Sequence, residues 1–130
     1  MLVLDASIVV VACTTDAGFA RYESQPLCAP ALMWSEARSS LREAVWRGEL
    51  SAEDGREFLE RLESAPVERA AHARLGPEAW RMAEQLGWAK TYDAEYLALA
   101  TLLGCRFVTL DGRLYRRTVH LGFVVSPAEL

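Results

Sequence analysis

Four acidic side chains occupy positions where a single carboxylate has no obvious partner. Asp5 directly follows the apolar run "MLVL", and Asp111 directly follows the apolar run "CRFVTL". Glu36 and Asp93 fall at helical spacing among apolar residues, on helix faces that should turn toward the protein core. Burial of an isolated ionised carboxylate is prohibitively unfavourable, so each group needs a partner or has to reach a cleft.

A single site shared by these carboxylates is the most economical solution. No cationic side chain lies on the apolar stripe of Glu36 or of Asp93. Two like charges about 4 Å apart repel by roughly 4 kcal/mol at an effective dielectric near 20, so a cluster needs a cation or has to protonate in part. Hard divalent cations prefer oxygen ligands. The sequence therefore predicts a Mg²⁺ or Mn²⁺ site formed by Asp5, Glu36, Asp93 and Asp111.

Each acid also has an ordinary structural explanation when it is considered alone. Asp93 stands close to the start of its helix and is suited to the N-cap position. Asp5 and Asp111 are equally suited to cap the segments that follow them, and Glu36 can reach water from the edge of its stripe. Without a shared site, the four acids would need four separate explanations, so the shared site is favoured.

The elements that must position these acids alternate between short apolar strands and amphipathic helices. Strands are expected at 1–4, 26–31, 66–70, 105–110 and 123–126. Helices are expected at 32–48, 51–65, 76–88 and 91–104. This alternation is typical of an α/β fold with a mostly parallel sheet, in which ligands bind beyond the carboxyl ends of the strands. Asp5 and Asp111 should therefore point toward the same rim.

Particular residues mark some of the boundaries. Gly48 and Gly104 are expected to stop the helices before them, and Ser51 is expected to cap the helix that follows it. Three segments are less clear. The stretch 6–13 fits a helix or a continued strand, 14–25 is expected to contain a short helix, and 112–122 fits a turn or a short helix.

Composition limits the class of protein. The chain has 130 residues, of which 52% are hydrophobic and 25% charged, so one domain with a substantial core is expected. The sequence has no apolar stretch long enough for a membrane span and no basic region typical of a signal peptide at its start. The three cysteines are an odd number without metal-ligand spacing, which fits buried thiols in a reducing cytoplasm.

Net charge gives no sign of nucleic-acid binding, because it is -4 at pH 7. The basic residues are nevertheless unusual, since Lys90 is the only lysine among 14 basic residues and the others are arginines. Arginine is the better bidentate ligand of phosphate groups. A bias in genomic composition explains the same observation.

Five segments together resemble a known family. They are "VLDAS", "WSEARSSL", "RGELS", "TYDAEYLALA" and "FVTLDGRL", in an order and at a spacing that agree across essentially the whole chain. The sequence resembles PIN-domain ribonucleases, and most closely the VapC-like toxins of type II toxin–antitoxin modules. The resemblance implies a single PIN domain over residues 1–130, with a three-layer fold in which a mostly parallel sheet of four or five strands lies between helices.

The resemblance also implies an active site. The acidic quartet of the family falls on Asp5, Glu36, Asp93 and Asp111, and its hydroxyl residues fall on Ser7 and Thr109. Gly112, which follows the fourth acid, is a small variation that would loosen the loop.

The implied activity is metal-dependent endoribonuclease cleavage with one or two Mg²⁺ or Mn²⁺ ions. Asp5 and Asp93 would bind the principal ion, and Glu36 would bind it or orient water. Asp111 would hold a second ion, or the first one through water.

The implied partners are RNA, a cognate VapB-like antitoxin and a second copy of the chain in a homodimer. Arg113, Arg116, Arg117 and Arg38 are candidates for contacts to the RNA backbone, although a solvated basic face explains them equally. An apolar groove for a partner is conceivable, with core filling as the alternative. Its candidate residues are Trp34, Trp46, Trp80, Trp88, Tyr22, Phe58 and Leu62. His72 and His120 have no ligand-like spacing and are interpreted as structural or surface residues.

Other functions fit less well. A phosphohydrolase with a nucleophilic aspartate would carry a second acid where this chain has Ser7, and a dinucleotide-binding enzyme would need a glycine-rich first turn. A PIN nuclease of RNA processing outside a toxin–antitoxin pair remains an alternative. So does a non-catalytic module that binds RNA or an antitoxin, although the complete acidic quartet argues against it.

Overall fold

The structure is a computed structural model that describes residues 1–130. Its centre is a five-stranded sheet in the order β3-β2-β1-β4-β5, in which every neighbouring pair is parallel. The strands are β1 (Leu2–Leu4), β2 (Leu27–Ala29), β3 (Glu68–Arg69), β4 (Arg106–Val108) and β5 (Val124–Val125). The predicted α/β class and the parallel sheet are therefore confirmed.

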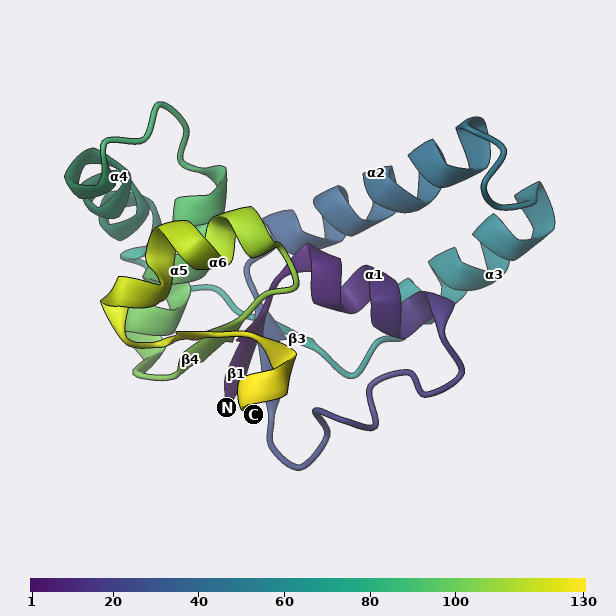
Figure 1. The fold of residues 1–130 in the computed structure, drawn as a ribbon, viewed down its shortest axis with the longest axis horizontal. Coiled ribbons are helices and arrows are strands. Elements are labelled where there is room, and N and C mark those ends of the chain that lie inside the picture. Colours follow the sequence, from purple (N-terminus) through teal and green to yellow (C-terminus); the bar gives the residue numbers. More distant parts are fainter.

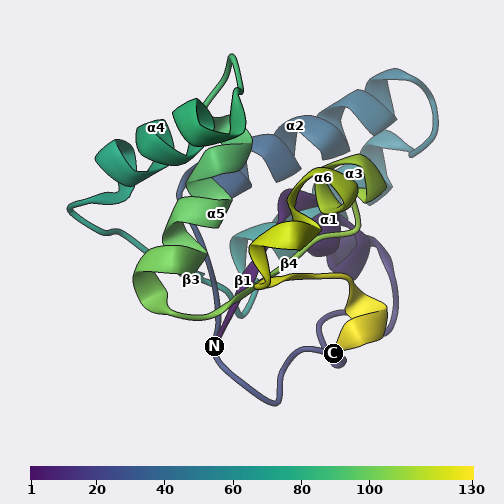
Figure 2. The same ribbon diagram turned by 60° about the vertical axis from the view of Figure 1, so that its left-hand side comes forward.

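Six α-helices flank this sheet. They are α1 (Ala6–Thr14), α2 (Leu32–Trp46), α3 (Ala52–Glu63), α4 (Leu75–Leu86), α5 (Tyr92–Leu103) and α6 (Gly112–Thr118), followed by two short 3-10 turns, Val119–Leu121 and Pro127–Glu129. Helices α4 and α5 lie on one side of the sheet and α1 and α6 on the other (Figure 2). Helices α2 and α3 form a hairpin that extends away from the sheet (Figure 1). The chain thus forms the three layers expected from its sequence.

Two uncertain segments and one expected helix are resolved by the structure. Residues 6–14 form helix α1, and 112–118 form the short helix α6. The short helix expected within 14–25 is wrong, because this stretch forms a series of turns. The hydroxyl groups of Thr14 and Thr15 donate to the carbonyl oxygen of Val11 instead of capping a new helix. These bonds satisfy the end of α1, and no new helix starts there.

The core fixes the position of α5 against the central strands. Tyr96 on α5 and Phe107 on β4 are both fully buried, and their rings stack with centroids 5.5 Å apart. Leu97 and Leu99 of the same helix are also fully buried. Aromatic pairs of this geometry add roughly 0.5–1.5 kcal/mol beyond the area that they bury. This packing determines which way the first turn of α5, with Asp93, faces.

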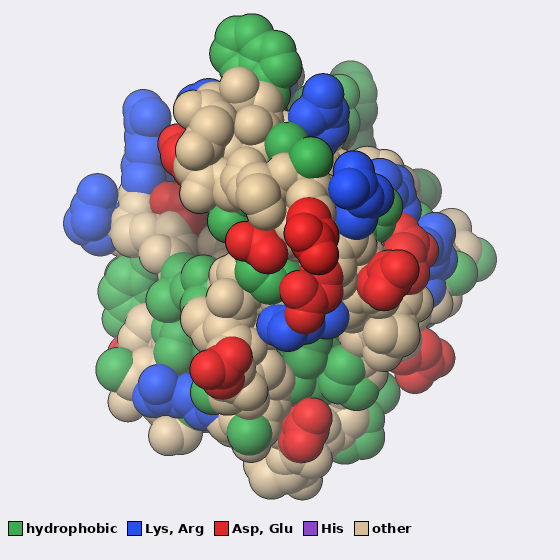
Figure 3. All heavy atoms as spheres, turned by 90° about the vertical axis from the view of Figure 1, so that its right-hand side faces the viewer, with side chains coloured by type: hydrophobic (Ala, Val, Ile, Leu, Met, Phe, Trp, Pro, Cys, Tyr) green, Lys and Arg blue, Asp and Glu red, His purple; other side chains and the backbone are tan.

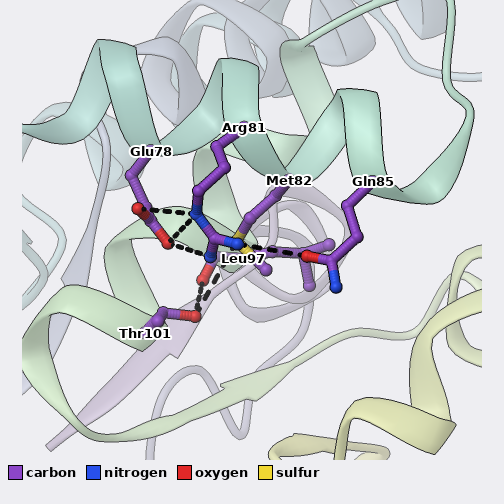
Figure 4. A network of polar contacts seen from close by, with 6 residues as sticks. All are labelled: Glu78, Arg81, Met82, Gln85, Leu97 and Thr101. Carbon is purple, nitrogen blue, oxygen red and sulfur yellow. Dashed lines mark hydrogen bonds and ion pairs between the residues drawn. The ribbon is translucent and has the colours of Figure 1, made fainter.

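Helix α4 supports α5 from the outside. Thr101 of α5 donates to the carbonyl oxygen of Leu97 and contacts the sulfur of Met82 on α4 at 3.8 Å (Figure 4). On the neighbouring turn of α4, Arg81 pairs with the largely buried Glu78 and also donates to Gln85 (Figure 4). Guanidinium bonds to Glu78 hold the pKa of this carboxyl below its usual value. Helices α4 and α5 thus pack tightly against each other beside the sheet.

Gly55 on α3 lies directly against α2. A methyl group at this position would overlap with a methyl carbon of Val45 on α2. We expect Gly55→Ala to lower the melting temperature, because overpacking by one carbon costs roughly 1–3 kcal/mol and outweighs a gain of about 1 kcal/mol in helix propensity. A thermal melt tests this, and Val45→Ala in the same chain should restore the loss. A melting temperature raised by Gly55→Ala alone would contradict the close approach.

Two further observations concern the chain as a whole. None of the helices is long and apolar enough to cross a membrane. The three cysteines form no disulfide, and Cys13 and Cys28 are buried while Cys105 is partly buried. Burial raises the pKa of the Cys13 and Cys28 thiols to about 11, so both remain protonated at neutral pH. The expectation of buried thiols is confirmed for these two residues.

Candidate active site

Asp5 and Thr109 lie side by side beyond the carboxyl ends of two neighbouring strands. Leu4 of β1 pairs with Val108 of β4, and the backbone N–H of Asp5 donates to the carbonyl oxygen of Val108 at 3.0 Å. The hydroxyl of Thr109 then donates to Oδ2 of Asp5 at 2.6 Å. The acid at the end of the first strand is therefore attached to the strand that leads to Asp111, as a parallel sheet requires.

Two hydroxyl groups hold Asp5 and at the same time hold the loop before α6. The hydroxyl of Ser7 donates to Oδ2 of Asp5 at 2.8 Å and accepts from the backbone N–H of Leu110 at 3.1 Å. Thr109 accepts in turn from the backbone N–H of Asp111 at 3.0 Å. Ser7 and Thr109, singled out by the resemblance, thus both contact Asp5. They also fix the distance between the first and the fourth acid.

Asp111 caps the helix that follows it. Its Oδ1 accepts from the backbone N–H groups of Arg113 and Leu114 at 3.0 and 3.1 Å, so it caps helix α6. The capping alternative is therefore correct for this acid, which does not exclude a metal contact from its other oxygen. Gly112 begins the helix directly after the cap.

Asp93 behaves differently from a capping residue. Thr91 occupies the N-cap position of α5, and Asp93 lies half-buried in the first turn. Its carboxylate makes no hydrogen bond and no ion pair within the protein. The capping alternative is therefore wrong for Asp93. The amide dipoles at the amino terminus of α5 favour its negative charge.

Glu36 is held by a residue that sequence reasoning did not single out. The hydroxyl of Tyr96 on α5 donates to Oε1 of Glu36 on α2. Tyr96 is fully buried, and burial together with this bond raises the pKa of its phenol, so the hydroxyl stays a donor. The signal in the sequence is the spacing of Asp93 and Tyr96, because residues three apart share a helix face.

The four acids shift one another's pKa values through electrostatic repulsion. Burial is the main cause that raises the pKa of Asp5, Glu36 and Asp93. Repulsion adds to it: Asp111 raises the pKa of Asp5. Asp5 and Asp93 raise that of Glu36, and Asp5 and Asp111 raise that of Asp93. The structure therefore brings all four predicted acids together into one electrostatically coupled group, which we call the acidic quartet.

The donor set of the quartet fits a hard divalent cation. Carboxylate oxygens are the ligands that Mg²⁺ and Mn²⁺ prefer, whereas no histidine or cysteine takes part. No three of the His, Cys, Asp and Glu side chains are arranged around one point as ligands. One oxygen each of Asp5, Glu36 and Asp111 accepts hydrogen bonds from other protein groups. Metal binding stays a prediction.

Two members of the quartet, Glu36 and Asp93, line a cleft of about 430 Å³ between α2, the α4–α5 connection and α6, whereas Asp5 and Asp111 do not. Glu36 and Asp93 contribute carboxylates to its lining, and Arg117 and Lys90 contribute cations. Arg117 lowers the pKa of Asp93, opposing the effect of burial. The apolar stripe of Asp93 thus does have a cation nearby, which comes from α6 and not from α5 itself.

The other arginines named as RNA contacts lie elsewhere. Arg113 and Arg116 are exposed on α6 and do not line the cleft. Arg38 pairs with Glu63 of α3 at 3.1 Å and lines a separate groove of about 550 Å³ between α2 and α3. Seen from the end of this hairpin, acidic and basic side chains are interspersed (Figure 3). Arg117 is therefore the arginine best placed to act with the quartet.

The apolar groove that the tryptophans were expected to supply is wrong as a single surface. Trp34, Tyr22 and Leu62 are buried, as the core-filling alternative holds. Trp46 and Trp80 are 80% and 68% exposed, but they belong to different helices, α2 and α4. Helical spacing alone does not show which apolar side chains are covered by neighbouring elements. The histidines take no part in the site.

Metal-free stability should depend on pH through Asp5. Its pKa is raised above the ordinary value of 3.8, so the folded state binds its proton more tightly than the unfolded state does. Stability contributed in this way is present below 3.8 and is lost as pH rises through the folded pKa. In chelator, we expect Asp5→Asn to become more stable than the natural chain as pH rises from 4 to 7. About ten thermal melts, with both proteins at the same pH values, measure this difference. A constant difference across this range would contradict the charge coupling.

The sequence matches a known protein family. Residues 2–119 match the model of the PIN domain family. The chain is 38% identical over 116 residues to the VapC ribonuclease Mb0985 of Mycobacterium bovis, covering 88% of both chains. It is 35% identical over 124 residues to ribonuclease VapC12 of Mycobacterium tuberculosis, covering 92% of this chain and 94% of the relative.

Solved structures show the same fold at lower identity. PAE2754 from Pyrobaculum aerophilum superposes with a TM-score of 0.75 at 22% identity, covering 98% of this chain and 91% of that one. A toxin–antitoxin complex from Klebsiella pneumoniae contains a chain with a TM-score of 0.71 at 14% identity, covering 98% of both. Together with the family match over residues 2–119, the parallel sheet and the acidic quartet at its rim show that the chain belongs to the PIN-domain family.

Proposed function

We propose that this protein is a metal-dependent endoribonuclease and the toxin of a type II toxin–antitoxin module. The observation that carries the proposal is the coupled quartet of carboxylates at the rim of the sheet, next to an open cleft. Relatives at 35% and 38% identity over most of the chain are named ribonucleases, which supports RNA as the substrate.

Asp5 and Asp93 would hold the principal Mg²⁺ or Mn²⁺ ion, and Asp111 would hold a second ion or the first through water. A bound divalent ion lowers the pKa of water toward neutrality and offsets charge on the leaving oxygen. The chain contributes the positions of these ligands. Ser7 and Thr109 hold one oxygen of Asp5, and the cap of α6 holds one oxygen of Asp111.

Glu36 is the residue best suited to accept a proton from the attacking water. Tyr96 donates to its Oε1, Oε2 accepts no hydrogen bond within the protein, and the residue lines the cleft. Burial and the neighbouring carboxylates raise the pKa of Glu36 toward the range in which a carboxylate is an effective general base. Tyr96 therefore acts as a positioning residue for Glu36.

The proposed partners follow from the same assignment. RNA is the proposed substrate, a VapB-like antitoxin is the proposed inhibitor, and the cytoplasm is the proposed location. The fold is shared with a chain from a toxin–antitoxin complex, which supports such a partner. An antitoxin arginine inserted among the quartet would form charge-assisted bonds with the carboxylates. A homodimer is proposed as the form of the free toxin.

RNA cleavage by the purified chain, free of antitoxin, tests the proposal. Total RNA incubated with Mg²⁺ or Mn²⁺ should be cut, and chelator should stop the reaction. A folded chain that cuts no RNA with either ion and shows no heat of Mn²⁺ binding would contradict the proposed activity and favour a non-catalytic binding module.

A further inference from the structure

Besides Glu36 and Asp93, the cleft is lined by two aromatic side chains, Trp88 and Tyr92, and by two cations, Lys90 and Arg117. We call these four residues the aromatic–basic wall of the cleft. Bases of single-stranded RNA stack on aromatic side chains, while its phosphates bind arginine and lysine. We propose that this wall binds the nucleotide next to the scissile phosphate. The proposal rests on the proposed function, which it extends to the way in which the substrate is held.

Arg117 is oriented for an incoming anion. Its guanidinium carbon lies 4.7 Å from the centroid of the Trp88 ring, and the side chain forms no ion pair within the protein. Stacking on a ring leaves the N–H groups at the edge of a guanidinium available for bidentate contact with phosphate. Arg117 is thus a pre-positioned cation, next to carboxylates whose charge would otherwise repel RNA.

The backbone at Trp88 is fixed, so its ring stays in place to stack with Arg117. Gly87 ends α4 with φ at +71°, a conformation that favours glycine, and the N–H of Trp88 then donates to the carbonyl oxygen of Ala83 at 2.8 Å. The Trp88 ring is half-buried against the core. In this arrangement Trp88 positions Arg117, and Arg117 contacts the RNA.

Tyr92 supplies the surface for the base. Its side chain is 60% exposed although it is the first residue of α5 and directly precedes Asp93. A base stacked on this ring would lie in the cleft that Asp93, Lys90 and Arg117 also line. The chemical class recognised is therefore a single-stranded nucleotide with an unpaired base, without selection of a particular base by hydrogen bonds.

Binding measurements test this wall apart from catalysis. Fluorescence anisotropy with a labelled single-stranded RNA and Mg²⁺ would be measured in an Asp5→Asn background, so that no cleavage occurs. We expect Tyr92→Leu to weaken binding by about ten-fold, because the base loses the ring on which it stacks, and Tyr92→Phe by less than about two-fold, because stacking needs only the ring. Trp46→Leu, a change at an exposed tryptophan far along α2, is the matched control and should have no effect.

The role of Arg117 has its own readout. Arg117→Gln should reduce the slope of log affinity against log salt by about 0.7, the value for one lost phosphate contact on a single strand. An arginine that only neutralises Asp93 would leave this slope unchanged. Trp88→Leu should reduce the slope in the same way, while Trp88→Phe, which keeps a ring beneath the guanidinium, should retain most of it.

The outcomes separate the two proposals. If RNA binds with the expected dependence on Tyr92 and Arg117 but the natural chain cuts nothing, the wall stands and the nuclease assignment fails. If the natural chain cuts RNA while Tyr92→Leu and Arg117→Gln leave affinity, salt slope and KM unchanged, the wall is wrong. Absence of any RNA binding in the Asp5→Asn background would overturn the wall as well.

Discussion

Asp93→Asn is expected to reduce metal-dependent RNA cleavage by at least about 100-fold. Loss of a residue that merely supports a metal ligand lowers affinity or activity by roughly 10–100-fold, and Asp93 is proposed as a ligand itself. Asparagine has nearly the same shape as aspartate, and the Asp93 carboxylate makes no hydrogen bond that the change would break. The effect should therefore come from lost charge alone. Initial cleavage rates at several Mn²⁺ concentrations measure it.

The matched control is Asp54→Asn on helix α3. Asp54 lies exposed in the first turn of its helix, as Asp93 lies in the first turn of α5. Its carboxylate makes no hydrogen bond, and its backbone N–H donates to the hydroxyl of Ser51. This variant should cleave RNA like the natural chain. Asp93→Asn should also be at least as stable as the natural chain in chelator, because it removes repulsion from Asp5 and Asp111. Equal cleavage by both variants would remove Asp93 from the site.

The sequence predicts the rim of the sheet well because two signals there are local. An apolar run followed at once by an acid marks Asp5 and Asp111, and both acids lie at the ends of the neighbouring strands β1 and β4. Asp93 and Glu36 were identified by a carboxylate on an apolar helix face. In each case the pattern spans only a few residues, so periodicity is sufficient to find it.

Contacts between distant segments could not be predicted in this way. Tyr96 donates to Glu36 across 60 residues of sequence, and Arg117 on α6 stacks on Trp88 in the α4–α5 connection. Each of these residues has an ordinary local setting, and only the packing of α5 against the sheet brings Tyr96 to Glu36. The hydrogen bonds that hold Asp5 likewise depend on the register of β1 and β4.

Local rules also failed where two of them compete. Thr14, Thr15 and Asp16 are all good N-cap residues, which predicted a helix after them. The two threonine hydroxyls bond backward to Val11 instead, because short polar side chains can serve the end of a helix as well as the beginning of another. For Asp111 both interpretations are correct, because this residue caps α6 and also belongs to the acidic quartet.

Saturating Mn²⁺ is expected to raise the melting temperature of the natural chain by about 10 °C. An ion present at 100 times its dissociation constant stabilises the folded state by about 2.7 kcal/mol when it does not bind the unfolded chain. For a domain of this size each kcal/mol raises the melting temperature by about 4 °C. The quartet makes such a gain reasonable, because burial and mutual repulsion disfavour its charges until a cation is bound.

Asp5→Asn should differ from the natural chain both in its stability in chelator and in its response to Mn²⁺. The variant keeps an oxygen that accepts from Ser7 and Thr109, so its fold is preserved, but it lacks one of the charges that would hold the ion. Its melting temperature in chelator should exceed that of the natural chain, while Mn²⁺ should raise it little. Potassium chloride at equal ionic strength controls for screening of surface charge. If Mn²⁺ shifts the natural chain and Asp5→Asn equally, the ion binds outside the quartet. If it shifts neither, the carboxylates destabilise the fold without holding a metal, and the proposed chemistry has no basis.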